Sequence, residues 1–287
     1  MALGNAHVTT TTAANFIPEL WALDVLEAAE KNLVMADLVA RFDDVAADGG
    51  DVIHVPRVSN FAAQTKAPNA QVTPQSTTED KVSIPLANHK EVSFLIEDIV
   101  AVQAKSSLRE IYTKKAGHAI ARAIDTHLLG LHALAARQVS AIGDDEEVGQ
   151  ALVAAMRYLD SADAPVEDRF LVVGPDLKAR LLALPGFTNR DYLSPGDPNA
   201  PMATGLVGDI LGCRVHLSNN ISSSTQSGIE TFHSVMFQRH AIALAIQLGP
   251  RVQASYVPEY LGTLVTVDVI YGYAMLNDDL IVDVWSQ

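Results

Sequence analysis

The chain has 287 residues, of which 48% are hydrophobic and 19% charged, so it can bury a large core as one large domain or two modest ones. Its 20 basic and 34 acidic side chains give a formal net charge of −14, which argues against a surface that grips a phosphate backbone through clustered lysines and arginines. Cys213 is the single cysteine, which excludes an intrachain disulfide and a thiolate metal cluster.

The beginning of the chain carries neither a signal-peptide pattern nor a membrane span. No lysine or arginine precedes Lys31, and no apolar run approaches the roughly 18 residues that cross a bilayer. We therefore expect synthesis in the cytoplasm and no membrane partner. Residues 1–17 are polar and threonine-rich and are expected to form an arm. Pro18 and the helical spacing of Trp21, Val25 and Leu33 predict one or two helices over 18–41.

Residues 44–92 have the pattern of an extended β-hairpin. A glycine-rich turn at 48–51 precedes a β-rich run at 52–58, which Pro56 restricts to a sheet edge because proline lacks the N–H that a ladder needs. A second strand is predicted over 82–87 from strict alternation of apolar residues. The intervening 62–80 are polar or small, with Val72 as the one aliphatic residue larger than alanine. So long a polar connection predicts a projecting loop that meets a partner.

The remaining chain alternates helices and strands without a regular βαβ rhythm. A strand is predicted over 89–97, and a capping box at 107–110 opens an amphipathic helix of about 31 residues, roughly 45 Å long. A helix from Asp144, a strand at 170–173 and a helix from 174 to about 185 follow, then a loop at 187–205. Strands are predicted at 214–217 and 234–237, a short alanine-rich helix at 241–246, and a β-rich end over 252–285. The expected fold class is α+β.

No pattern in the chain predicts catalytic, cofactor or metal chemistry. His118, Asp125, His127 and His132 share the long helix, but the last two are five residues apart, about 140° around the axis, and lack the i, i+4 spacing of a zinc helix. Cys213 lies in an apparent strand rather than at a helix start, so a buried thiol is expected. The acidic run at 144–147 is explained by helix capping, and the glycine and proline at 174–175 by a helix start. We expect no enzyme, no cofactor and no metal.

Several local strings, in this order, resemble the major capsid proteins of tailed bacteriophages, especially the short-tailed enterophage type. They are Phe16-Ile17-Pro18-Glu19-Leu20-Trp21, the run Gly49-Gly50-Asp51-Val52-Ile53-His54-Val55-Pro56, Phe170-Leu171-Val172-Val173-Gly174-Pro175, the run Gly208-Asp209-Ile210-Leu211-Gly212-Cys213-Arg214-Val215, Tyr260-Leu261-Gly262 and Ile270-Tyr271-Gly272-Tyr273. The resemblance implies an N-terminal arm and first helix (1–43), an extended loop (44–92), a peripheral domain on a spine helix (93–140 with 251–287) and an axial domain (141–250).

This resemblance also implies function and partners. The chain would assemble with itself, as hexamers and pentamers, into the icosahedral shell of the virion, with a separate scaffolding protein, a portal, and double-stranded DNA packaged by non-specific proximity. Candidate intersubunit contacts are Phe16, Trp21, Arg57, Lys66, Val72, Lys81 and Lys90. Some family members crosslink a loop lysine to a neighbour, but no motif here specifies that reaction. Two alternatives remain: an encapsulin-like nanocompartment shell, and an enzyme whose site is assembled from scattered residues.

Overall fold

A computed structural model of the chain describes residues 34–99, 108–184 and 208–287, apart from positions 48, 59, 60, 62, 70, 73, 75–78, 227 and 228. These residues belong to one compact unit that covers Lys31–Gln287. The predicted arm and most of the helix predicted over 18–41 lie outside the described residues. What is described of that helix is α1 (Met35–Leu38), which ends in an extended residue before the short strand β1 (Ala40–Arg41).

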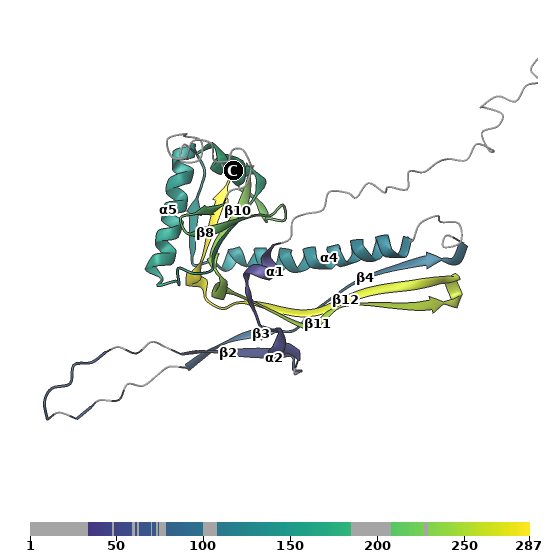
Figure 1. Cartoon of the computed structure of the whole chain (residues 1–287), viewed down its shortest axis with the longest axis horizontal. Helices are drawn as coiled ribbons and strands as arrows, with labels where there is room; N and C mark the ends of the chain where they lie inside the picture. Colours follow the sequence, from purple (N-terminus) through teal and green to yellow (C-terminus); the bar gives the residue numbers. More distant parts are fainter. Residues whose placement is uncertain are drawn as a thin grey trace, which may run out of the picture. The chain divides into compact units, whose positions relative to one another are not determined.

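A four-stranded sheet in the order β1–β11–β12–β4 supports the long helix. Its strands are β11 (Ile242–Val257), β12 (Gly262–Met275) and β4 (Asn88–Glu97), with β1 beside the start of β11. Helix α4 (Leu108–Gly130) contacts β4 and β12 and runs along them (Figure 1), followed by the 3-10 turn η2 (Leu131–Leu134). The helix is therefore shorter than predicted, because its last turn tightens after Gly130. Its stripe at 116, 120, 124 and 128 is buried as predicted, whereas Tyr112 and Leu134 are exposed.

A seven-stranded sheet and two helices form the second part of the fold. Its order is β5–β13–β10–β6–β8–β7, with β9 also on β10. The strands are β5 (Arg137–Ser140), β6 (Arg169–Val173), β7 (Asp209–Ile210), β8 (Cys213–Leu217), β9 (Ser223–Gln226), β10 (Ile229–Gln238) and β13 (Ile281–Ser286). Helix α5 (Asp145–Ser161) has the predicted cap, since the Asp144 carboxylate accepts a hydrogen bond from the Glu147 N–H. Helix α6 (Pro175–Ala183) begins with the predicted proline.

The alanine-rich helix predicted at 241–246 is wrong. After the 3-10 turn η3 (Arg239–Ala241), this segment is the start of β11. Ala243 and Leu244 pair with β1 on one side and with β12 on the other, so sheet hydrogen bonds on both edges override the helix propensity of alanine. All four residues from 242 to 245 are buried, which no amphipathic surface helix would allow.

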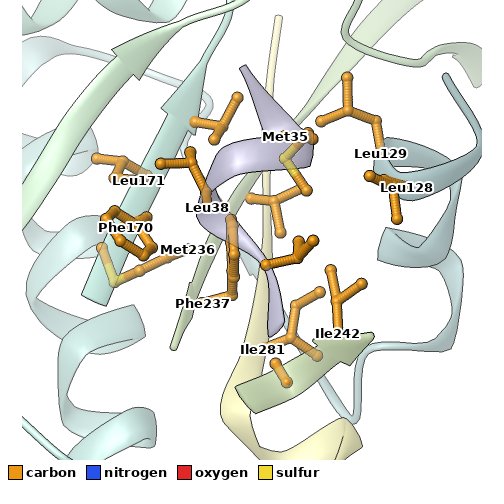
Figure 2. Close-up of a cluster of buried hydrophobic side chains, with 14 of the residues drawn as sticks. Met35, Leu38, Leu128, Leu129, Phe170, Leu171, Met236, Phe237, Ile242 and Ile281 are labelled. Atoms are coloured by element: carbon orange, nitrogen blue, oxygen red, sulfur yellow. The ribbon is translucent and has the colours of Figure 1, made fainter. Parts of the chain in front are cut away.

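The main hydrophobic core surrounds α1. Figure 2 shows Met35 and Leu38 between side chains of five other elements. Met35 is fully buried. The labelled neighbours are Leu128 and Leu129 of α4, Phe170 and Leu171 of β6, Met236 and Phe237 of β10, Ile242 of β11 and Ile281 of β13. A single turn of helix thus packs against the long helix and against both sheets. The burial of Met35 and Leu38 is the contribution of this turn to the stability of the fold.

A second, smaller core fixes the base of the predicted hairpin. Strands β2 (Val52–Val58) and β3 (Glu79–Pro85) pair antiparallel from Val52 opposite Pro85 to Val58 opposite Glu79. Ile53 and Ile84 are buried with Leu86, with Ala243 and Ala245 of β11, and with Ala46 of helix α2 (Asp43–Ala47). The pair forms a two-stranded sheet, so Pro56 stands on an edge as predicted, and β3 begins three residues earlier than expected.

Gly272 of β12 marks the closest approach between this hairpin base and the large sheet. A Cβ atom built on Gly272 would lie 2.4 Å from the Pro85 carbonyl oxygen and 2.9 Å from Leu86 Cδ2. We expect Gly272→Ala to lower the free energy of unfolding by about 1–3 kcal/mol, since a backbone oxygen must move. Gly117→Ala is the matched control: no heavy atom lies within 4 Å of its Cβ in helix α4. That change should stabilise by up to about 1 kcal/mol. Urea unfolding of both variants tests this, and equal stabilities would contradict the steric argument.

Candidate assembly surfaces

The hairpin loop, defined here as residues 61–74, contains the first candidate surface. Every described residue of this loop is exposed, and none belongs to a helix or strand. The exposed fractions of Phe61 and Val72 are 68% and 67%. Side chains so exposed gain little from the fold of their own subunit, so most of their apolar surface is available to another molecule.

The candidate contact residues fall in different parts of the structure. Lys66 and Val72 lie in the hairpin loop. Arg57 and Lys81 lie on β2 and β3, where Arg57 pairs with Asp80, and both are exposed. Lys90 is exposed on β4, in the four-stranded sheet. Phe16 and Trp21 lie outside the described residues. The structure thus places four of the seven candidates on the hairpin.

A second candidate surface, which sequence reasoning missed, is the far end of the four-stranded sheet. We call it the sheet tip and define it by Ile99, Tyr256, Tyr260 and Leu261, whose exposed fractions range from 53% to 65%. Tyr260 belongs to the 3-10 turn η4 (Pro258–Tyr260) that joins β11 to β12. The sequence places Tyr256, Tyr260 and Leu261 in a β-rich segment, but alternation alone does not reveal that they are exposed among the described residues.

Hydrogen bonds hold the sheet tip in one conformation. The Tyr256 hydroxyl donates to Asp98 Oδ2 at 2.9 Å, and the Asp98 N–H donates to the Leu261 carbonyl at the same distance. The hydrogen bond to Asp98 raises the pKa of Tyr256 above its ordinary value, so this donor keeps its proton. Leu261 has φ of 43°, in the left-handed region that closes the turn. The sheet tip is therefore an exposed apolar surface whose turn is held by hydrogen bonds.

An ionic cluster fixes the register of the sheet behind the tip. Arg251 of β11 donates to both oxygens of Asp268 on β12, at 2.8 and 3.0 Å, and His89 Nε2 of β4 lies 3.1 Å from the same carboxylate. The hydrogen bond from Arg251, followed by that from His89, lowers the pKa of Asp268. Three strands are thus tied together next to the register shifts of β11 between 246 and 251.

The outer half of β11 is an open sheet edge among the described strands. Strand β1 pairs with Ala243 and Leu244 only, and the residues from 249 to 256 are all exposed. Unpaired N–H and C=O groups along such an edge, next to an apolar tip, favour association with another chain.

Three titratable residues that the sequence placed on the long helix, Asp125, His127 and His132, contact different parts of the structure. Asp125 is buried and accepts hydrogen bonds from Met35 N–H and Asn220 Nδ2. His127 Nδ1 lies 2.8 Å from the Tyr271 hydroxyl. Burial lowers the pKa of His127 and raises the pKa of Tyr271 to about 12, so the tyrosine is the donor. His132 lies against Asp283. The helix therefore presents no shared ligand set on one face.

Cys213 is fully buried in β8, as predicted for a structural thiol. Burial raises the pKa of Cys213 to about 11. Almost none of it is thiolate at neutral pH, which argues against a nucleophilic or redox role.

A family model described as "Phage capsid protein" matches residues 44–285. The chain belongs to this family. The fold agrees with a solved structure described as "Mycobacterium phage Che8". That chain is 27% identical and superposes with a TM-score of 0.81, covering 94% of this chain and 97% of that one. No curated protein matches the chain.

Two further solved structures share the fold over most of the capsid protein. The capsid of cyanophage P-SCSP1u is 17% identical, with a TM-score of 0.78 and coverage of 95% and 94%. The mature capsid of bacteriophage PhiM1 is 15% identical, with a TM-score of 0.75 and coverage of 94% and 92%. The predicted tailed-phage capsid fold is confirmed. The short-tailed enterophage subtype stays a prediction.

The capsid protein is thus a major capsid subunit that assembles with itself into the shell of a bacteriophage virion. Its role is structural. No helix among the described residues combines the length and apolarity that a membrane crossing requires.

Proposed function

We propose that the subunits join into the hexamers and pentamers of an icosahedral shell through the hairpin loop and the sheet tip. The observation that carries this proposal is the exposure of large apolar side chains on both surfaces, with Phe61 68% and Leu261 65% exposed. Burying each such side chain on a neighbour contributes about 1.5–3 kcal/mol, and symmetry repeats the contact around every capsomer. Of the predicted contacts, Lys66 and Val72 would lie within the interface, with Arg57 and Lys81 beside it.

We assign parts of the chain to capsid roles as follows. Within the predicted segment 44–92, the hairpin up to the end of β3 is the extended loop. Helix α4 with the four-stranded sheet, which includes β4 from Asn88, is the peripheral domain. The seven-stranded sheet with α5 and α6 is the axial domain. Because β5 and β13 are hydrogen-bonded into that second sheet, we place them with the axial domain, while β11 belongs with the peripheral one. Phe16, Trp21 and Lys90 remain proposed contacts on the arm and the peripheral sheet.

The negative charge of the chain supports a shell that encloses the genome without binding its phosphates. With a net charge of −14, the shell would enclose double-stranded DNA by proximity and without gripping its phosphates. We propose that a separate scaffolding protein and a portal take part in assembly, that the chain is made in the host cytoplasm, and that it has no catalytic activity of its own. The match to phage capsid proteins favours a virus shell over an encapsulin-like compartment.

The sheet tip offers a direct test. We expect Tyr260→Lys to lower the yield of closed shells at least about tenfold, since a charge at an apolar contact costs more than the 1.4 kcal/mol that corresponds to that factor. The stability of the free subunit should change by less than about 0.5 kcal/mol, because the side chain is exposed. Negative-stain microscopy and sedimentation measure the yield.

Tyr260→Phe is the matched control, because it keeps the ring and removes only the hydroxyl. Shells should form at the parent yield. Normal shells from Tyr260→Lys would show that the sheet tip is not a contact.

A further inference from the structure

Three side chains from distant parts of the sequence converge beyond the end of the spine helix. They are His132 in η2, His233 on β10 and Asp283 on β13, and their ligand atoms all lie within 4.8 Å of one another. The Nδ1 atoms of His233 and His132 lie 3.0 Å and 3.5 Å from the same oxygen, Asp283 Oδ2. His233 and Asp283 project from the same face of two hydrogen-bonded strands, and η2 contacts β13 beside them.

This group is buried, and two of its polar atoms lack partners. The Asp283 side chain is 1% exposed, and the side chains of His132 and His233 are 14% and 12% exposed. Neither Asp283 Oδ1 nor His132 Nδ1 has a hydrogen-bond partner within the described part of the chain. A buried carboxylate oxygen without a donor is costly, so the arrangement calls for a positive group at this point.

Neighbouring hydroxyl groups determine which nitrogen of His233 carries a proton. The Thr231 hydroxyl donates to the Ser224 carbonyl at 2.9 Å, so its single proton is used. The Ser224 hydroxyl, 2.8 Å from Thr231 Oγ1, must then donate to that oxygen. Ser224 Oγ consequently accepts from His233 Nε2, also at 2.8 Å. In the neutral imidazole, Nδ1 is then the bare nitrogen.

In that tautomer the bare Nδ1 of His233 faces Asp283 Oδ2 at 3.0 Å, so two lone pairs oppose each other unless a second proton on the ring or a metal cation lies between them. A second imidazole presents its Nδ1 to the same oxygen, and the two rings stack at a centroid distance of 4.2 Å with an interplanar angle of 19°. Two protonated rings stacked in this way would repel each other. A metal ion satisfies both nitrogens and the carboxylate at once.

We propose that His132 Nδ1, His233 Nδ1 and the Asp283 carboxylate bind one divalent cation of the zinc class. Imidazole nitrogen and carboxylate oxygen are ligands that zinc accepts, at about 2.0–2.2 Å, which places tetrahedral ligand atoms about 3.3 Å apart. Two of the three separations between the ligand atoms, 3.0 and 3.5 Å, bracket that value, and the third is within 4.8 Å. Ser224 is the outer partner that orients His233 through Nε2, a common arrangement for metal-bound histidine. Water can complete the coordination.

Such an ion would clamp the end of the spine helix onto the seven-stranded sheet. Residue 132 lies in η2, which follows α4 directly, whereas residues 233 and 283 lie on the paired strands β10 and β13. The proposal departs from the expectation of no metal. That expectation compared histidines along one helix, and the ligands come from segments about 100 and 50 residues apart in the chain.

The test uses the full-length protein, both as free subunit and as shells, stripped with a chelator and dialysed against zinc chloride. Elemental analysis after washing should find about one zinc per subunit. His132→Gln and Asp283→Asn should lose it, whereas His240→Gln, an exposed histidine outside the group, should keep it. Ser224→Ala should weaken zinc binding about 10- to 100-fold. Cobalt in place of zinc should give visible d–d absorption in the parent and not in His132→Gln.

Washed protein without stoichiometric metal would overturn the proposal and leave a protonated His233 paired with Asp283. Unchanged zinc content in His132→Gln would overturn it as well. If Asp283→Asn fails to fold, His132→Gln still decides, because the His132 Nδ1 atom makes no hydrogen bond among the described residues and its loss leaves the hydrogen bonds of His233 in place.

Discussion

Replacing residues 59–78 by Asn-Gly should leave a folded subunit that no longer builds robust shells. Val58 and Glu79 are a paired position of β2 and β3, so a two-residue turn can join them directly. The small core beneath the hairpin uses Ile53, Ile84 and Leu86, which the change leaves in place. The free variant should therefore unfold cooperatively within a few degrees of the parent. Assembly should fail or yield fragile particles, because the hairpin loop is absent.

The reason lies in the ordering entropy of the loop. Fixing a backbone costs about 1–2 kcal/mol per residue, and all described residues of the loop are exposed, so burial within their own subunit offsets little of that cost. Hydrogen exchange should accordingly show no protection at 63–69 in the free subunit and clear protection in shells. The double variant Phe61→Ser/Val72→Ser keeps the full length of the loop. It is the control that distinguishes the loss of apolar contacts from the loss of loop length. Normal shells from the Asn-Gly variant would mean that the hairpin is not an intersubunit device.

Asp125→Ala should lower the free energy of unfolding by about 3 kcal/mol or more. The carboxylate is 2% exposed and accepts hydrogen bonds from the N–H groups of Val34 and Met35, at 3.1 and 3.0 Å, and from Asn220 Nδ2 at 3.1 Å. Removing it takes the acceptor from the buried Met35 N–H and the part-buried Val34 N–H, at about 1–3 kcal/mol for a buried donor, whereas Asn220 Nδ2 keeps its hydrogen bond to Thr126 Oγ1. It also loosens α1, which fills the centre of the main core. Urea unfolding of the free subunit measures the loss.

Arg122→Ala is the matched control for that change. It lies one turn earlier on the same helix with an exposed side chain, so its effect should stay within about 0.5 kcal/mol. Equal stability of the two variants would show that Asp125 does not join α1, α4 and the segment at 220. Asp125→Asn should fall between them, since its amide offers one acceptor oxygen and brings a donor toward other donors.

The candidate surfaces show how far sequence reasoning reaches. The hairpin was predictable because its signals are local: a turn, alternating strands and a polar connection between them. The sheet tip was not predictable, because tyrosine and leucine at positions such as 256 and 261 are usually buried in a strand. Their exposure depends on where the two sheets end relative to each other. The convergence of His132 with His233 and Asp283 was hidden for the same reason, since the ligands are adjacent only after β10 and β13 pair.

The sequence alone predicted the α+β class, the cap at Asp144 and the burial of Cys213 from patterns among residues within a few turns of one another. The capsid-type order of segments came instead from the resemblance to tailed-phage capsid proteins. Only the tertiary structure decided that 242–246 is a strand, since its pairing partners lie 25 to 33 residues later and about 200 residues earlier in the chain. The same holds for Asp125, whose sequence position suggests a helix face and whose role comes from donors 90 and 95 residues away. Non-local hydrogen bonds outweigh local propensity wherever burial removes water as the alternative partner.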